Sequence, residues 1–148
     1  KNEVMETIGP KGTASFVGTF NGHVYSLAAA LATLELLIDG NIRIDLERKI
    51  QYLKSSFEGS AKKYGIPALL NGRGGHFHWY FTDNVKNYRD AASSNFDNYI
   101  AFTKSMLEQS MLVIPKPLSH HAISASHDDI IIEKIVDAMD ISLRKIVK

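Results

Sequence analysis

The stretch DLERKIQYLKSSFEGSAKKYG, residues 45–65, decides the fold that we expect for this chain. Gly65 stands where a helix ends in a left-handed residue, and Pro67 follows it. The apolar residues recur at spacings of three and four, so they form one stripe of a helix over 45–64. The stripe consists of Leu46, Ile50, Leu53, Phe57, Ala61 and Tyr64. Such a stripe needs an apolar surface to cover.

The sequence after this helix predicts short strands and two more helices. The Gly-Arg-Gly-Gly stretch at 72–75 suits a turn or bulge between two strands, and Pro115 and Pro117 close a third strand. Ser126, three residues before Asp129, resembles a capping box. The strands are expected over 68–71, 76–82, 111–114 and 122–126, and the helices over 96–108 and 129–147.

The first forty residues have a different pattern. We expect a helical turn over 3–8, an extended run over 15–20, and an Ala-rich helix from about residue 21 to Asp39, which Gly40 ends. The apolar residues of this helix spread around much of its circumference, and it has no strand partner of its own. It therefore needs another body to pack against, either a missing domain or a second subunit.

Together these elements predict an α+β fold. A long lead-in helix precedes a small, three- to four-stranded, mainly antiparallel sheet that helices cover on one face. We expect a boundary that separates residues 1–40 from a small α+β domain over 41–148.

Composition narrows the classes of function. Apolar residues make up 45% of the 148 and charged residues 22%, which is typical of a globular protein. The net charge is +1 without a basic run, so we expect no nucleic-acid partner. Cysteine is absent, which excludes disulfides and thiolate chemistry and fits a cytoplasmic protein.

The chain shows no sign of membrane insertion or export. Its longest apolar stretch, 27–38, is interrupted by Thr33 and Glu35 and is too short to span a bilayer. No signal peptide is visible. Because the chain begins with Lys1 rather than Met, we expect either a piece cut from a longer polypeptide or a processed product.

The stretch VGTFNGHVYSLAAALATLELL, residues 17–37, places a threonine just before a helix. Free N–H groups at a helix start and a threonine hydroxyl together suit a phosphate, although such a threonine is usually only a turn residue. The stretch resembles the segment after the cofactor lysine in class III aminotransferases. The resemblance implies that Gly18 and Thr19 contact the phosphate of pyridoxal phosphate held by the other subunit of a homodimer.

Four further segments resemble the same family in the same order, so the likeness covers nearly the whole chain. It is greatest to the glutamate-1-semialdehyde aminomutase branch. It implies the C-terminal part of a fold-type I enzyme, in which residues 1–40 end the large cofactor domain and lead through a connecting helix to the small domain. The four segments are 2–8, HFHWYFTD at 76–83, FTKSMLEQSMLVIP at 102–115, and ISASHDDIIIEKIVDAM at 123–139.

The resemblance also indicates what this chain lacks. The Schiff-base lysine of the family, and the aspartate that pairs with the pyridine nitrogen, lie upstream of everything present here. We therefore expect no catalytic residue in this chain and no activity from it alone. The partners implied are the large domain of the same polypeptide, a second subunit, and a small amino acid or amine as substrate.

One position departs from the aminomutase pattern. Aminomutases carry a glutamate near the substrate amines where this chain has Ser119, so a transaminase or a racemase is as credible as an aminomutase. His120 and His121 are candidates for the substrate entrance, or are plain surface residues. Arg73 is the candidate for holding a substrate carboxylate.

The six histidines allow a competing interpretation. His76 and His78 alternate and so share one face of a strand, and three more histidines lie on or beside another strand. Three imidazoles could hold zinc or copper without cysteine, although no HExxH motif is present. The chain would then be a stand-alone metal-binding domain, or an interaction domain without chemistry. The three further histidines are His120, His121 and His127.

Overall fold

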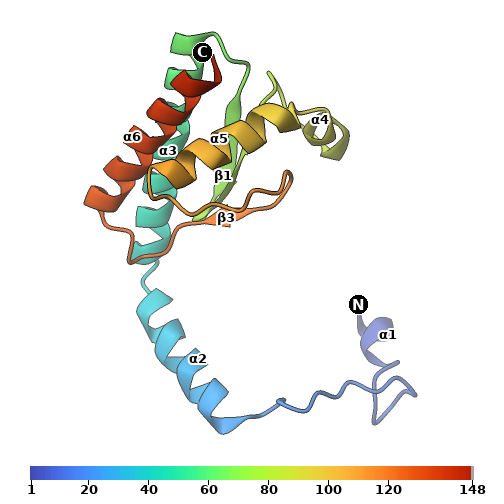
Figure 1. Ribbon diagram of the computed structural model, residues 1–148. Coiled ribbons are helices and arrows are strands. Elements are labelled where there is room, and N and C mark those ends of the chain that lie inside the picture. Colours follow the sequence, from blue (N-terminus) through green and yellow to red (C-terminus); the bar gives the residue numbers. More distant parts are fainter. Residues whose placement is uncertain (148) are drawn as a thin grey trace. The chain divides into compact units, whose positions relative to one another are not determined.

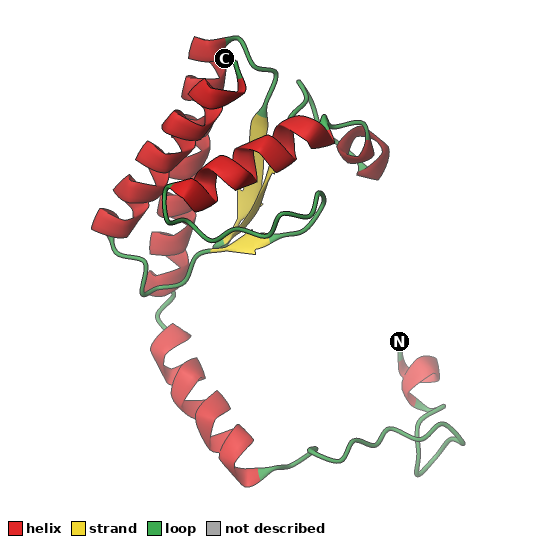
Figure 2. Ribbon diagram, in the orientation of Figure 1, coloured by secondary structure: helices red, strands yellow, loops and turns green. Residues whose placement is uncertain are grey.

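The computed structural model describes residues 1–147, which form two compact units (Figures 1 and 2). The first unit is Lys1–Asp39 and the second begins at Gly40. Each unit is described by itself below. Among the described residues, none of the helices combines the length and the apolar character that a membrane span requires.

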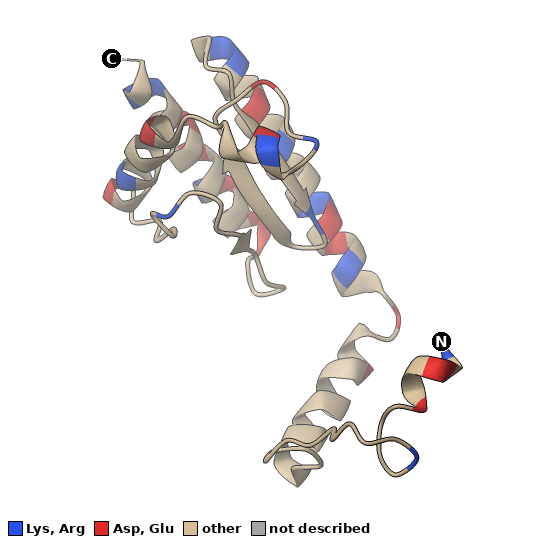
Figure 3. Cartoon of the chain, turned by 90° about the vertical axis from the view of Figure 1, so that its right-hand side faces the viewer, with Lys and Arg blue, Asp and Glu red and all other residues tan. Residues whose placement is uncertain are grey.

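The first unit contains two helices, α1 (Asn2–Met5) and α2 (Val24–Leu37). Helix α2 begins later than expected, because a turn closed by the N–H of Asn21 on the carbonyl of Gly18 occupies the preceding residues, and His23 is its N-cap. The extended run expected over 15–20 is not a strand. No residue of α2 is buried within this unit, and it carries a single charge, on Glu35 (Figure 3).

The second unit is built on α3 (Asn41–Tyr64), the helix that the quoted stretch predicts. It begins four residues earlier than expected, after Gly40, which has a φ of 79°. It ends as predicted at Gly65, whose φ of 69° is left-handed and whose following N–H, on Ile66, bonds the Ala61 carbonyl. This arrangement satisfies carbonyls that a helix end leaves unpaired.

A three-stranded antiparallel sheet lies against α3. Its order is β1-β2-β3, with β1 at Leu69–Arg73, β2 at His76–Tyr80 and β3 at His121–Ala122. The α+β class, the antiparallel sheet and the covering helices are confirmed. The remaining helices are α4 (Tyr88–Ala92), which lies outside every element expected from the sequence, α5 (Phe96–Glu108) and α6 (Asp129–Ile146).

The core of this unit lies between the sheet and α3, α5 and α6 (Figure 1). The α3 stripe supplies fully buried residues, and Trp79 of β2 stacks edge-on against Phe102 of α5 at 5.2 Å. The Trp79 indole N–H also points at the sulfur of Met139 in α6, 3.2 Å away. The largest buried side chains include Ile50, Leu53, Phe57, Leu70, Tyr99, Met106, Ile132 and Leu143.

Two predicted strands were wrong in part. Residues 111–114 are not in the sheet, because the Ile114 carbonyl is bonded by the Tyr99 hydroxyl instead of a neighbouring strand. In place of the strand expected over 122–126, only the two residues of β3, His121 and Ala122, are in the sheet. The Ser124 N–H bonds the His127 ring instead of a neighbouring strand. The capping box at Ser126 is also wrong, because the N-cap of α6 is Asp128, which accepts from the Ile131 N–H.

Candidate functional site

A pair of stacked imidazoles lies on the neighbouring strands β2 and β3. His78 of β2 and His121 of β3 have ring centres 5.6 Å apart and planes only 7° apart. Both are buried, at 6% and 8% exposure. Antiparallel pairing of Phe77 with His121 is what brings the two rings together.

Tyr99 of α5 joins this pair to the loop that precedes β3. Its hydroxyl lies 2.7 Å from the Ile114 carbonyl and 3.0 Å from Nε2 of His121. A carbonyl can only accept, so the single phenolic proton is donated to Ile114. The Nε2–H of His121 must therefore donate to the Tyr99 oxygen, which fixes the tautomer of that imidazole.

Burial keeps all three rings uncharged near neutral pH. It lowers the pKa of His78 to about 4, with a further lowering by His121 and an opposing hydrogen bond to the Ser119 main chain. It lowers the pKa of His121 to about 4 as well, with a smaller contribution from His120. The pKa of Tyr99 rises to about 12 for the same reason. Desolvation disfavours the charged form in each case.

A tight turn lies next to this cluster. The Ser119 N–H bonds the Lys116 carbonyl at 3.3 Å, with Pro117 and Leu118 between them. Leu118 has a φ of 62°, in the left-handed region that a type II turn requires at this position and that glycine usually fills. For a leucine, this conformation costs about 1–2 kcal/mol. The surrounding contacts must hold the turn against that cost.

An open groove of about 520 Å³ runs beside the turn and β3. Its walls are mostly apolar, His121 contributes from the buried side, and His120 is exposed. The His120 ring lies 5.6 Å from that of His76. The lining residues are Leu112, Val113, Ile114, Pro115, His120, His121 and Ala122.

The structure brings only some of the sequence-predicted residues together. His120 and His121 line the groove and Ser119 lies half-buried in the adjacent turn, but the surface alternative is wrong for His121. Arg73 is exposed at the end of β1, where it pairs with His76 and does not line the groove.

Gly18 and Thr19 lie in the first unit, in the exposed turn before α2. A Cβ at Gly18 would come within 2.9 Å of the Asn21 side-chain oxygen, so the turn is tight at this glycine.

Two residues of the cluster were missed as site residues. His78 was considered only as a possible metal ligand, and Tyr99 only as part of a helix. A hydroxyl on an otherwise apolar helix face was the available signal for Tyr99, because a buried tyrosine usually finds a hydrogen-bond partner. Nothing in the local sequence pairs His78 with His121, which is 43 positions away.

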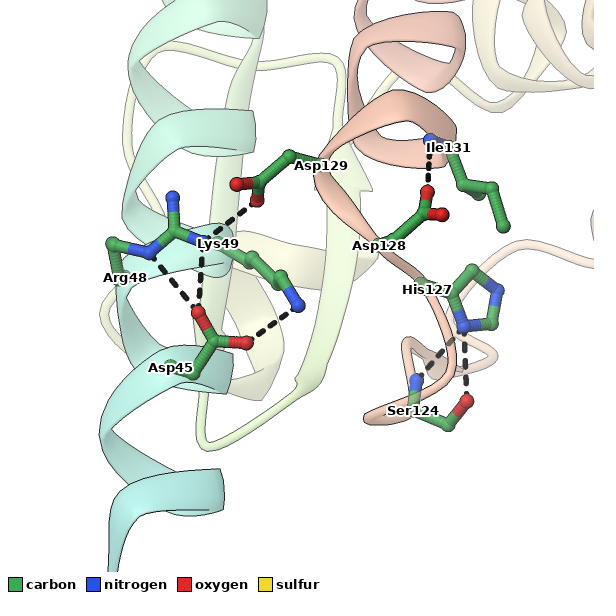
Figure 4. A network of polar contacts seen from close by, with 8 residues as sticks. All are labelled: Asp45, Arg48, Lys49, Ser124, His127, Asp128, Asp129 and Ile131. Carbon is green, nitrogen blue, oxygen red and sulfur yellow. Dashed lines mark hydrogen bonds and ion pairs between the residues drawn. The ribbon is translucent and has the colours of Figure 1, made fainter.

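The histidines do not form a metal centre in the part of the chain that the structure describes, where no group of three or more potential ligands could hold an ion. Figure 4 shows that His127 and the two aspartates after it take part in hydrogen bonds within the protein. His127 accepts from the Ser124 N–H at 3.1 Å, Asp128 caps α6, and Asp129 bonds Arg48 of α3 at 2.7 Å. His76 is exposed although His78 is buried.

A second open groove, of about 550 Å³, lies between α3 and α6. Two carboxylates line it, those of Asp137 and Asp140, and the second already has hydrogen-bond partners. Asp140 accepts from the Ser60 and Tyr64 hydroxyls at 2.7 and 2.9 Å and lies 3.7 Å from the Lys63 ammonium. These bonds tie the two helices together, so this groove is structural.

Comparison with proteins of known sequence places the chain beside the aminomutases. Glutamate-1-semialdehyde 2,1-aminomutase of Methanococcus vannielii is 32% identical over 147 residues, which is 99% of this chain and 34% of that protein. Glutamate-1-semialdehyde 2,1-aminomutase 1 of Bacillus cereus is 33% identical over the same share of each chain. The chain thus spans about a third of the length of the curated relatives it matches. No protein-family model matches it.

The solved structures that the chain resembles in fold include transaminases. An omega-transaminase from Sphaerobacter thermophilus matches 97% of this chain with a TM-score of 0.74 at 20% identity, over 34% of its own length. A β-phenylalanine aminotransferase from Variovorax paradoxus matches 95% with a TM-score of 0.77 at 22% identity, over 33% of its length.

The fold is therefore that of the C-terminal region of the transaminases. In sequence, the chain is a relative of the glutamate-1-semialdehyde 2,1-aminomutases, and the resemblance to the C-terminal portion of a class III aminotransferase is confirmed.

Proposed function

We propose that this chain is the C-terminal part of a pyridoxal-phosphate enzyme that moves an amino group, either as a glutamate-1-semialdehyde aminomutase or as an aminotransferase. The observation that carries the proposal is the similarity to aminomutases along 99% of the chain. The transaminase fold over the same residues supports it.

The cofactor would be held in part by the turn before α2. The Thr19 side chain is exposed there, and the tight turn at Gly18 leads toward the start of a helix. A hydroxyl and helix-start N–H groups are suited to a phosphate. Thr19 would donate its hydroxyl to the phosphate of the cofactor in a neighbouring subunit. When bound, pyridoxal phosphate supplies the electron sink for the reaction.

The rest of the cofactor site would come from the large domain of the same polypeptide, which residues 1–40 would end, in a homodimer. The exposed apolar residues of the first unit support this, because such surface is usually covered by another domain or subunit. Examples are Leu27, Leu31 and Leu34 of α2, each about 60% exposed. Without the large domain and its lysine, this chain would be inactive.

The substrate would be a small amino acid or amine that enters beside residues 119–121. The resemblance implies that Ser119 stands where aminomutases carry a glutamate, in which case the amine would be bound differently here. His120, exposed in the groove, would contact the entering substrate. Arg73 is the weaker candidate, since it does not line the groove. We place the enzyme in the cytoplasm, in line with its lack of cysteine.

The test is absorbance spectroscopy on a longer parent polypeptide expressed with pyridoxal phosphate, beside the 148-residue chain. We expect the visible band of a lysine-bound cofactor in the longer protein only, and bleaching of that band by amine donors. A variant that lacks the cofactor lysine is the control. A longer protein that binds no cofactor, or whose band ignores every amine donor, would contradict the proposal.

A further inference from the structure

Tyr99 is a core residue whose hydroxyl makes hydrogen bonds of its own. The side chain is 1% exposed and belongs to the hydrophobic core of the second unit. A phenylalanine ring would fill nearly the same space, so packing alone does not require the oxygen. A buried hydroxyl is unfavourable unless it is hydrogen-bonded, and this one has two partners, Ile114 and His121. The hydroxyl thus makes two contacts that the ring alone could not make.

The first partner, Ile114, lies in a segment without regular structure. Residues 111–120, between α5 and β3, form neither helix nor strand (Figure 1). At the start of the segment the Met111 N–H bonds a carbonyl of α5, and just after its end His121 pairs with β2. Between these two ends, the Tyr99 hydroxyl donates to the Ile114 carbonyl at 2.7 Å. A side chain of a packed helix therefore anchors a stretch that no helix or strand orders.

The second partner, His121, is held by the sheet. Its main chain pairs with Phe77 of β2, and its ring stacks on that of His78. The Nε2–H of His121 donates to the Tyr99 oxygen over 3.0 Å. Both Ile114 and His121 line the open groove of about 520 Å³. One buried oxygen thus connects two lining residues of the groove that come from different segments of the chain.

We propose that Tyr99 is a positioning residue for this groove, because its hydroxyl holds Ile114 in a fixed place relative to His121. Tyr99 is not itself among the lining residues, so it acts through these two. The connection between them rests on the contacts above. Its consequence for the enzyme rests on the proposed function, in which the substrate enters beside His120 of the same groove. The bond would then keep the entrance in one shape instead of several.

Tyr64 of α3 provides a matched control. It is also a helix tyrosine whose hydroxyl donates a hydrogen bond, at 2.9 Å, but its acceptor is Asp140, which lines the other groove. Tyr64→Phe and Tyr99→Phe each remove one oxygen and keep the ring. A loss of stability common to both variants therefore reports a missing hydrogen bond, whereas a change confined to Tyr99→Phe reports the groove.

The first experiment is NMR on the 148-residue chain near neutral pH. In the unmodified chain, the ring nitrogens of His121 should show one tautomer, with the proton on Nε2. The backbone order parameters of residues 112–114 should be about 0.85, as in a rigid backbone. Tyr99→Phe should give a mixture of the two His121 tautomers and should lower these order parameters to about 0.6 or below. Tyr64→Phe should change neither.

The second experiment places both substitutions in the parent enzyme. Tyr99→Phe should raise KM for the amine donor by about three- to tenfold, the equivalent of one lost hydrogen bond. Both kcat and the visible cofactor band should stay as in the unmodified enzyme, because the substitution removes no group that contacts the cofactor. Tyr64→Phe should leave KM unchanged.

The outcomes separate this role from the proposed function. An unchanged His121 tautomer with unchanged order parameters in Tyr99→Phe would overturn the positioning role, and so would equal changes in Tyr64→Phe. An unchanged KM in the parent enzyme, or a lower kcat at constant KM, would overturn its link to the substrate entrance. An unmodified parent without a cofactor band would contradict the proposed function, while the NMR result would still decide whether Tyr99 holds the groove.

Discussion

The imidazoles of His78 and His121 stack in parallel, 5.6 Å apart, inside a cluster that contains no charged side chain. The groups that face the pair are the hydroxyls of Tyr99 and Tyr80, the main chain of Ser119, and the neighbouring ring of His120. None of them offers a negative charge to an imidazolium. If both rings were protonated, the two imidazolium charges would repel one another, and burial would leave them poorly solvated.

This cluster predicts acid sensitivity of the second unit. The pKa of each histidine falls from 6.5 in the unfolded chain to about 4 in the folded one, so below pH 6.5 the unfolded chain binds more protons. Stability is therefore full above that pH and is lost as pH falls toward 4. Linkage gives a loss of about 2 kcal/mol per histidine between pH 7 and pH 5.

Urea unfolding at the two pH values measures this loss. His78→Phe should show roughly half the decrease of the unmodified chain, because one titrating group is gone. His76→Phe should keep the full decrease. Equal free energies of unfolding at pH 7 and pH 5 would show that the pair does not titrate as its burial requires.

Phe57 is a fully buried side chain of α3 in the core of the second unit. It has no exposed surface and contacts the rings of Trp79, Phe81 and Phe102. We expect Phe57→Ala to lower the free energy of unfolding by about 3–5 kcal/mol. Phe96→Ala, at a position 38% exposed, should cost much less. Similar losses in denaturant titrations of the two variants would argue against this core.

Two glycines should respond to alanine in opposite ways. Gly59 lies within α3, and no atom stands within 4 Å of the place that a Cβ would take, so Gly59→Ala should stabilise by about 0.5–1 kcal/mol. A Cβ at Gly72 would lie 2.6 Å from that of Phe77 and 3.1 Å from the Ile50 side chain. Gly72→Ala should destabilise by about 1–3 kcal/mol through overpacking. Thermal unfolding checks the sign of each change.

Thr19 provides a prediction for the cofactor site of the parent enzyme. Thr19→Val removes the hydroxyl and keeps the shape, so the dissociation constant for pyridoxal phosphate should rise about tenfold, as for the loss of one charge-assisted hydrogen bond. Thr13→Val, at another exposed threonine of the first unit, is the matched control. The measurement is an equilibrium titration with the cofactor. Equal cofactor affinity in the two variants would show that the Thr19 hydroxyl does not contact the phosphate.

Much of the fold could be predicted because its signals are local. The α3 stripe, the Gly65 stop and the bounds of α5 follow from helical periodicity and from residues with special backbone preferences. Residues 111–114 could not be assigned correctly in the same way. Their apolar pattern suits a strand, but the partner that takes the Ile114 carbonyl is a side chain, which no local pattern indicates.

The sequence by itself determined the existence of the longer helices α2, α3, α5 and α6, the α+β class and the relationship to the aminotransferases. Periodicity, glycine stops and the order of motifs can all be read from residues that are close together in the chain. Only the tertiary structure decided that His78, Tyr99 and His121 form one neutral cluster. Their side chains come from β2, α5 and β3, and strand register together with the packing of α5 brings them into contact. Burial, which sets their pKa values, is a property of that packing and not of any residue's neighbours in sequence.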